Sequence, residues 1–166
     1  MTTDFSTSLN TPIPVLHSGA GQVDVRGPRF AAWLTSGVLL AALAASAVSA
    51  AAAAAILAVQ AAVFAIGAHY GPRRHPYGRV FARLVAPRLG PATEREPVEP
   101  LRFAQLVGLA FAVTGTAGFA AGVPVLGVTA TALALAAAFL NAAFGICLGC
   151  QIYPLAARLR RVGRRG

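Results

Sequence analysis

Residues 30–72 read FAAWLTSGVLLAALAASAVSAAAAAAILAVQAAVFAIGAHYGP, and they contain no Asp, Glu, Lys or Arg. A second uncharged stretch extends over residues 103–157. A membrane-spanning helix needs about 20 mostly apolar residues, so each stretch is long enough for two spans. The sequence therefore predicts an all-α, polytopic membrane protein with four transmembrane helices, arranged as two hairpins and packed as a bundle.

The expected spans are residues 30–48, 52–70, 103–122 and 125–149, which together with their connections form a membrane domain over residues 23–157. Trp33 suits an interfacial anchor near the start of the first span. A Gly-Pro pair at residues 71–72 is a stop signal for the second. Residues 1–22 are predicted to be a flexible arm, and residues 158–166 a basic tail.

The composition points to lipid as the partner of the basic residues. Hydrophobic residues make up 57% of the chain and charged residues only 11%, against roughly a quarter charged in soluble domains. The net charge is +9, but the arginines flank apolar stretches and do not cover a polar fold. We therefore expect a bilayer with anionic headgroups as the partner, and no nucleic acid.

Between the second and third spans, apolar side chains recur at helical spacing over residues 76–86, with Arg79 and Arg83 on another face. This pattern predicts an amphipathic juxtamembrane helix, ended by Pro87, whose arginines face lipid phosphates. Residues 91–100 are expected to form an exposed loop.

The positions of the arginines predict an orientation. All 14 basic residues lie before the first span, between the second and third, or after the fourth, and the two remaining turns have none. The positive-inside rule then places both termini and the central loop in the cytoplasm, as in a multi-pass protein of the inner (plasma) membrane.

Both cysteines of the chain lie at the end of the fourth apolar stretch, as Cys147-Leu-Gly-Cys150. This C-x-x-C spacing is typical of redox pairs or metal ligands. On a helix that continues to Gly149, the pair lies near a C-terminus, where the helix dipole opposes a thiolate, and Pro154 is expected to kink or end that helix. Two small thiols that merely pack in the bundle are the alternative.

A metal site is a further alternative. Cys147 and Cys150, joined by His69 and His75 near the same membrane face, would complete a tetrahedral zinc set. A site made only of cysteines, shared across a homo-oligomer, is equally compatible with the sequence. No other cofactor is indicated.

Helix packing is predicted to use small residues, including Gly145 and Gly149 on one stripe of the fourth span. The amide side chains of Asn141, Gln60 and Gln105 are expected to bond neighbouring helices. The spans contain no ionisable carboxylate or arginine, which argues against a proton relay or a pathway for charged substrates. Motifs of hydrolases and kinases are also missing.

Three segments carry a family resemblance: Val23-Asp-Val-Arg-Gly-Pro-Arg-Phe30, Arg102-Phe-Ala-Gln105, and Leu140-Asn-Ala with Cys147-Leu-Gly-Cys-Gln-Ile-Tyr153. In these the chain resembles an uncharacterised bacterial family of small integral membrane proteins, a domain of unknown function, over residues 23–158. The resemblance implies four membrane helices. It also implies a neighbourhood of genes for thioredoxin-like proteins or sulfurtransferases, and hence thiol or sulfur chemistry.

Two hypotheses of different classes follow. In the first, Cys147 and Cys150 exchange disulfides with a thioredoxin-like or sulfurtransferase partner, and either cysteine could attack. In the second, the chain is a non-enzymatic membrane adaptor or assembly subunit, whose cysteines are structural and whose arginine-rich segments bind lipid or protein.

Overall fold

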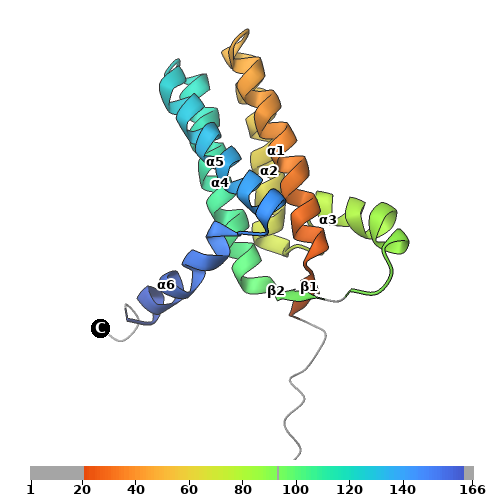
Figure 1. Ribbon diagram of the computed structural model, residues 1–166. Helices are drawn as coiled ribbons and strands as arrows, with labels where there is room; N and C mark the ends of the chain where they lie inside the picture. Colours follow the sequence, from red (N-terminus) through yellow and green to blue (C-terminus); the bar gives the residue numbers. More distant parts are fainter. Residues whose placement is uncertain (1–20, 93, 163–166) are drawn as a thin grey trace, which may run out of the picture.

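The computed structural model describes residues 21–92 and 94–162 (Figure 1). Its helices and strands follow one another along the chain as β1 (Gln22–Asp24), α1 (Arg26–Ser46), α2 (Ala50–Tyr70), α3 (Pro76–Val80), a π-helical turn η1 (Phe81–Val85), a 3-10 turn η2 (Ala86–Arg88), β2 (Arg95–Pro97), α4 (Val98–Ala120), α5 (Pro124–Phe144) and α6 (Leu148–Val162).

Helices α1, α2, α4 and α5 are each long and apolar enough to cross a membrane. The prediction of an all-α polytopic membrane protein with four spans is thereby confirmed. The alanine-rich turn between the first two spans is defined by Ser49, whose Oγ accepts a hydrogen bond from the Ala52 amide at 3.2 Å. A serine in this position satisfies one of the free amides at the start of α2.

The two hairpins pack into a bundle, with α2 against α4 and α1 against α5. Figure 1 shows the tips of both hairpins at one end of the bundle and β1, β2, α3 and α6 at the other. The core contains Leu39, Leu57 and Phe119 together with small alanines. At the crossing of α4 and α5, a Cβ on Gly118 would lie 2.6 Å from the Gly127 amide nitrogen, so only glycine permits this approach.

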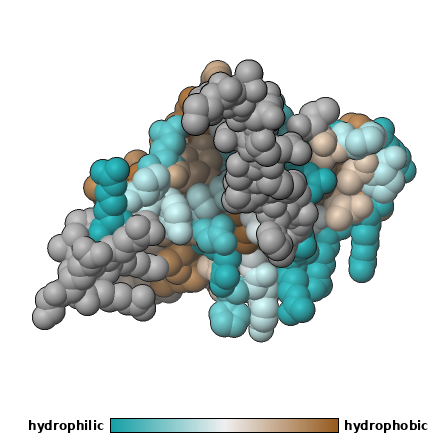
Figure 2. Space-filling view, turned by 90° about the horizontal axis from the view of Figure 1, so that it is seen from below, coloured by the Kyte–Doolittle hydropathy of each residue, from teal (hydrophilic) through white to brown (hydrophobic). Residues whose placement is uncertain are grey.

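The end of the bundle that carries β1, β2, α3 and α6 is the charged end. Every basic residue that the structure describes lies in or beside these elements, at the ends of the spans. Figure 2 views the molecule from this side and shows hydrophilic side chains gathered on its surface. By contrast, the flanks of the spans expose apolar side chains such as Leu40, Val59 and Leu133, as expected for lipid-facing helices.

A short antiparallel sheet joins the segment before α1 to the central loop. In it Val23 pairs with Glu96, and Asp24 with Arg95. The sequence predicted an exposed loop over residues 91–100. None of the described residues of this segment is buried, but residues 95–97 form β2 and α4 begins at Val98, so the second half is not a loop. Strands of three residues are too short to show the alternation of polar and apolar residues by which strands are recognised.

The amphipathic segment differs from its prediction in form. It is not one helix over residues 76–86 but α3, η1 and η2 in succession, and it continues past Pro87 to Arg88. Proline is tolerated there because it occupies the first turn of η2, where no amide hydrogen bond is required. The segment projects sideways from the bundle in Figure 1 and is attached through Phe81, whose ring centroid lies 5.8 Å from that of Phe30.

The last apolar stretch is divided between two helices. Helix α5 ends at Phe144, and Gly145 adopts a left-handed conformation with φ of 70°. The prediction that the fourth span continues to residue 149 was therefore wrong. Glycine is the residue most often found in this conformation at helix ends. The Gly145 amide donates a hydrogen bond to the Asn141 carbonyl at 3.0 Å. Pro154 does not end the helix, as one of the two predicted outcomes had it, since α6 continues through it to Val162.

Candidate functional site

The break after α5 places the two cysteines at the start of a new helix. Cys147 immediately precedes α6, and its Sγ accepts a hydrogen bond from the Cys150 amide at 3.3 Å. Its carbonyl oxygen accepts the Gln151 amide at 3.1 Å. These two contacts, from the third and fourth amides of the helix, define an N-cap residue. Cys147 is therefore the N-cap of α6, with sulfur in the position usually held by a serine or aspartate oxygen.

This arrangement reverses the expectation drawn from the sequence. A C-x-x-C pair at a helix C-terminus would face a partial negative charge, which opposes a thiolate. At a helix N-terminus the free amides carry partial positive charge and stabilise one. The reason for the reversal is Gly145, which ends α5 two residues before the first cysteine.

The surroundings lower the pKa of the Cys147 thiol to about 7. The hydrogen bond from the Cys150 thiol is the largest cause, and burial acts in the opposite direction. The backbone amides of Cys150 and Gly149 lower the pKa further. At pH 7 this thiol is therefore ionised to a larger extent than an ordinary cysteine with a pKa near 8.5, which is ionised to only about 3%.

Cys150 is affected in the opposite direction. Its pKa is raised, chiefly because its thiol donates to the Cys147 sulfur and is held in the protonated form. Burial and the negative charges of Cys147 and Glu96 raise it further. The site thus contains one thiol that ionises easily and one that keeps its proton, and both are partly exposed.

Helix α6 is held against the bundle next to the thiols. A Cβ on Gly149 would lie 2.7 Å from the Cα of Ala104, so the start of α6 is in close contact with α4. One turn further along, the Tyr153 ring lies 5.9 Å from the Phe103 ring. These contacts fix the direction in which the two amides of the first turn point.

Two charged residues from distant parts of the sequence flank the pair. The Arg29 guanidinium from α1 lies beside Gly145, about 3.6 Å from where a Cβ would stand. Glu96 on β2 acts on both thiols through its negative charge. Burial raises the pKa of Glu96 itself, and the nearby Arg29 lowers it. Neither residue was predicted to lie near the cysteines, because no pattern in the sequence indicated the β1–β2 sheet that brings Glu96 here.

Large apolar side chains lie exposed around the cysteines. Phe144 and Ile146 precede the two cysteines in the sequence, and Leu148 lies between them. Ile152 follows Cys150 on α6. Two of these four side chains are more than half exposed, Phe144 at 65% and Ile152 at 51%. An exposed apolar patch around a reactive thiol is a suitable surface for a docking partner or for lipid.

The structure does not assemble the predicted zinc set. Over residues 21–92 and 94–162, no three His, Cys, Asp or Glu side chains lie close enough together to hold a metal ion. At the end of α2, the His69 ring lies edge-to-face with the Tyr70 ring, with 4.6 Å between the ring centroids. His75 is buried against Gly67, and burial lowers its pKa to about 4, against the opposing effect of the Gln105 amide beside it.

The predicted packing residues have separate roles. Gly145 is the C-cap of α5 and Gly149 lies in α6, so they do not share one stripe of a helix. Asn141 lies in the last turn of α5, where its carbonyl accepts the Gly145 amide. Arg79 and Arg83 are exposed on the laterally projecting segment, beside the exposed apolar residues Val80 and Leu84.

A buried polar contact links α2 to the projecting segment. The Tyr77 hydroxyl donates to the Gln60 Oε1 at 2.8 Å, and Gln60 is completely buried. The sequence had marked Gln60 and Gln105 as amides that bond neighbouring helices. It did not indicate Tyr77 as the partner of Gln60.

The motifs quoted above from residues 23–30, 102–105 and 140–153 all lie in elements that meet at the charged end of the bundle. A family model described as a domain of unknown function, DUF4395, matches residues 23–158. The chain belongs to this family. The resemblance drawn from the sequence is thereby confirmed for the family and its extent. No curated protein and no solved structure matches the chain.

Proposed function

We propose that this DUF4395 protein is a membrane thiol–disulfide exchange protein in which Cys147 is the attacking thiol and Cys150 the resolving thiol. The observation that carries the proposal is the Cys147 sulfur in the N-cap position of α6, bonded by the Cys150 amide. A thiol with a pKa near the ambient pH combines a high thiolate fraction with good nucleophilicity. The lowered pKa of Cys147 meets this condition.

The exchange proceeds in two steps. The Cys147 thiolate attacks one sulfur of a partner disulfide, a mixed disulfide forms, and the second partner sulfur leaves as a thiolate with the electron pair. Cys150 then loses its proton and attacks the Cys147 sulfur, which releases the first partner sulfur. The chain ends with a Cys147–Cys150 disulfide and the partner with two reduced sulfurs. In the reverse direction the same steps reduce the chain's disulfide.

The partner fits a cytoplasmic protein with its own reactive thiols, of the thioredoxin-like or sulfurtransferase kind. The arginines gathered at the cysteine end favour the cytoplasmic side of the inner membrane for that end and for both termini. The exposed side chains of Phe144, Ile146 and Ile152 provide an apolar surface next to the attacking sulfur. Such a surface suits a partner that must approach a thiol at the membrane face.

The test is a trapping experiment in cells with two matched variants. Cys150→Ser retains the attacking thiol and lacks the resolving one, so it should accumulate mixed disulfides that a reductant releases. Cys147→Ser keeps a side chain that can cap α6 but lacks the attacking thiol, so it should trap little. Equal trapping by both variants, or by neither, would contradict the assigned roles.

A membrane adaptor is the second candidate, and one observation favours it. The segment from α3 to η2 projects sideways from the bundle and exposes apolar Val80 and Leu84 together with Arg79 and Arg83. This combination suits a segment lying in an anionic headgroup layer. If the chain acts mainly as an adaptor, the double variant Arg79→Gln with Arg83→Gln will impair the function of the protein in cells more than replacement of both cysteines does.

A further inference from the structure

The second step of the proposed exchange requires an acceptor for one proton. In the reduced chain Cys150 keeps this proton, since its thiol donates to the Cys147 sulfur. Once Cys147 is part of a mixed disulfide, its sulfur carries no charge and this hydrogen bond is weakened. Burial and the negative charge of Glu96 still raise the pKa of Cys150. A group that takes the proton from Cys150 would therefore speed the release of the partner.

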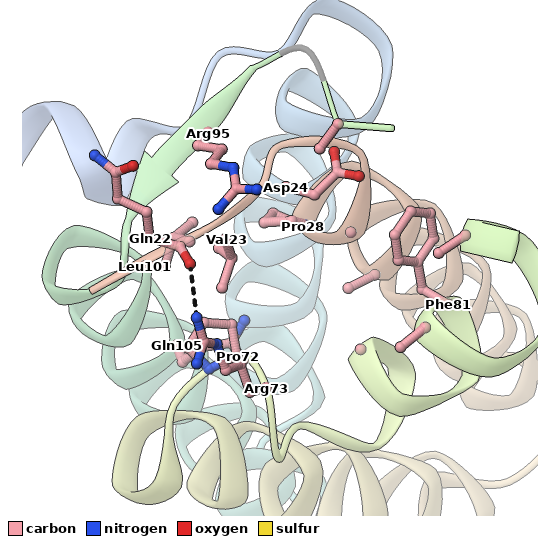
Figure 3. Close-up of a pocket in the computed structure, with 16 residues that line it drawn as sticks. Gln22, Val23, Asp24, Pro28, Pro72, Arg73, Phe81, Arg95, Leu101 and Gln105 are labelled. Atoms are coloured by element: carbon pink, nitrogen blue, oxygen red, sulfur yellow. Dashed lines mark hydrogen bonds between the residues drawn. The ribbon is translucent and has the colours of Figure 1, made fainter. Parts of the chain in front are cut away.

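The short sheet determines the direction in which Glu96 points. Glu96 pairs with Val23, and paired residues on neighbouring strands have their side chains on the same face of a sheet. Figure 3 shows Val23 pointing from β1 toward Gln105 on α4, so Glu96 also faces the bundle. Glu96 is accordingly the partly buried residue of β2, whose other two residues are exposed.

Arg29 connects Glu96 with the segment that carries the dithiol. It lies in the first turn of α1, and its positive charge lowers the pKa of Glu96. Its guanidinium covers Gly145, with Cζ and Nη2 each 3.6 Å from where a Cβ would stand on that residue. Gly145 precedes Cys147 by two residues. The carboxylate and the start of α6 thus share one cationic neighbour.

The other charged groups of the sheet leave the Glu96 carboxylate available. Arg95 lies on the opposite face, beside Asp24 in Figure 3, and helps to lower the pKa of Asp24. Burial and the negative charge of Glu94 raise the pKa of Glu96. Over residues 21–92 and 94–162, no hydrogen bond or ion pair engages the Glu96 carboxylate. A partly buried carboxylate of this kind accepts a proton more readily than an exposed one.

We propose that Glu96 accepts the proton of Cys150 in the second step of the exchange. This role rests on the proposed exchange. The S–H bond of Cys150 breaks, and its proton passes to a Glu96 oxygen. The electron pair left on the Cys150 sulfur forms the bond to Cys147, and the partner sulfur leaves as a thiolate with the pair of the broken disulfide bond. Loss of the proton to solvent would instead place a second negative charge beside Glu96 in a partly buried site.

The test is a single turnover of the reduced full chain in nanodiscs with dithiobis-nitrobenzoate, followed by the absorbance of released thionitrobenzoate. Attack by Cys147 releases one thionitrobenzoate, and attack by Cys150 releases a second, so two phases report the two steps. Cys150→Ser should show the first phase alone. Absence of the second phase from the unaltered chain would contradict the proposed exchange and, with it, the role of Glu96.

Glu96→Gln distinguishes a proton acceptor from a charge that merely repels. It removes the negative charge that opposes ionisation of Cys150, so a purely electrostatic role predicts a second phase at least as fast as in the unaltered chain. For a proton acceptor, the second phase should be slower by at least about tenfold at pH 7, because a positioned acid or base typically contributes about 10²–10⁴-fold. Added imidazole, as an external base, should then restore part of the rate.

Two further variants serve as controls. Glu96→Asp retains a carboxylate and should keep a faster second phase than Glu96→Gln. Glu99→Gln removes an exposed glutamate from the first turn of α4 and should leave both phases unchanged. An undiminished first phase in Glu96→Gln will show that the site remains folded. A second phase in Glu96→Gln as fast as in the unaltered chain would overturn the role of Glu96 while the exchange itself stands.

Discussion

The hydrogen bond from the Cys150 thiol should control the acidity of Cys147, and two variants that each leave a single cysteine can test this. Cys150→Ser keeps a hydroxyl that can donate to the Cys147 sulfur. Cys150→Ala removes the donor but retains the backbone amide that bonds the same sulfur at 3.3 Å. The two proteins thus differ mainly in the one contact that is the largest cause of the lowered pKa.

The expected difference follows from the strength of such a contact. A hydrogen bond to a charged group contributes about 1.5–3 kcal/mol, and one pKa unit corresponds to about 1.36 kcal/mol. The pKa of Cys147 should therefore be about one to two units higher in Cys150→Ala than in Cys150→Ser. The amides of α6 remain in both variants, so they contribute equally to the two pKa values.

The assay is the rate of iodoacetamide alkylation at Cys147 as a function of pH, followed by mass spectrometry on the membrane-embedded protein. The midpoint of the profile gives the pKa directly, independently of the intrinsic reactivity of the thiolate. In the unaltered chain the midpoint should lie near 7. Equal midpoints in the two variants, or a midpoint near 8.5 in the unaltered chain, would refute the assignment of this contact.

Further predictions concern the negative neighbour of the thiols, the helix crossing and the buried amide of α2. Glu96→Gln removes a charge that raises the pKa of Cys147, so the alkylation midpoint should move to lower pH. Gly118→Ala should reduce the unfolding free energy by about 1–3 kcal/mol through overpacking, whereas Gly37→Ala, which meets no atom within 4 Å, should not. Tyr77→Phe removes a bonded hydroxyl and should cost about 1–3 kcal/mol in the same denaturation assay.

The membrane fold could be predicted because it depends on features that are continuous in the sequence. Four spans follow from two uncharged stretches and from the length of helix that a bilayer requires. The arginines at the ends of these stretches indicated which end of the bundle is charged. These signals do not depend on how distant segments pack.

The site itself depended on single backbone conformations. Gly145 lies among residues that all suit a helix, and only its left-handed conformation ends α5 and starts α6 at Cys147. Without that break, the same C-x-x-C was assigned to the wrong helix end, where the helix dipole opposes a thiolate. Glu96 was missed for a related reason, since a pairing of two three-residue strands brings it to the site.

If Cys147 and Cys150 form a reversible redox pair, a redox titration of the full chain in nanodiscs will reveal it. The protein is equilibrated with mixtures of reduced and oxidised glutathione, quenched with acid, and labelled with a mass-shifting maleimide. A reversible pair should show one two-electron transition in which both labels are lost together. Neither Cys147→Ser nor Cys150→Ser should show a transition beyond single glutathione adducts. Independent modification of the two thiols in the unaltered chain, with no internal disulfide at any ratio, would contradict it.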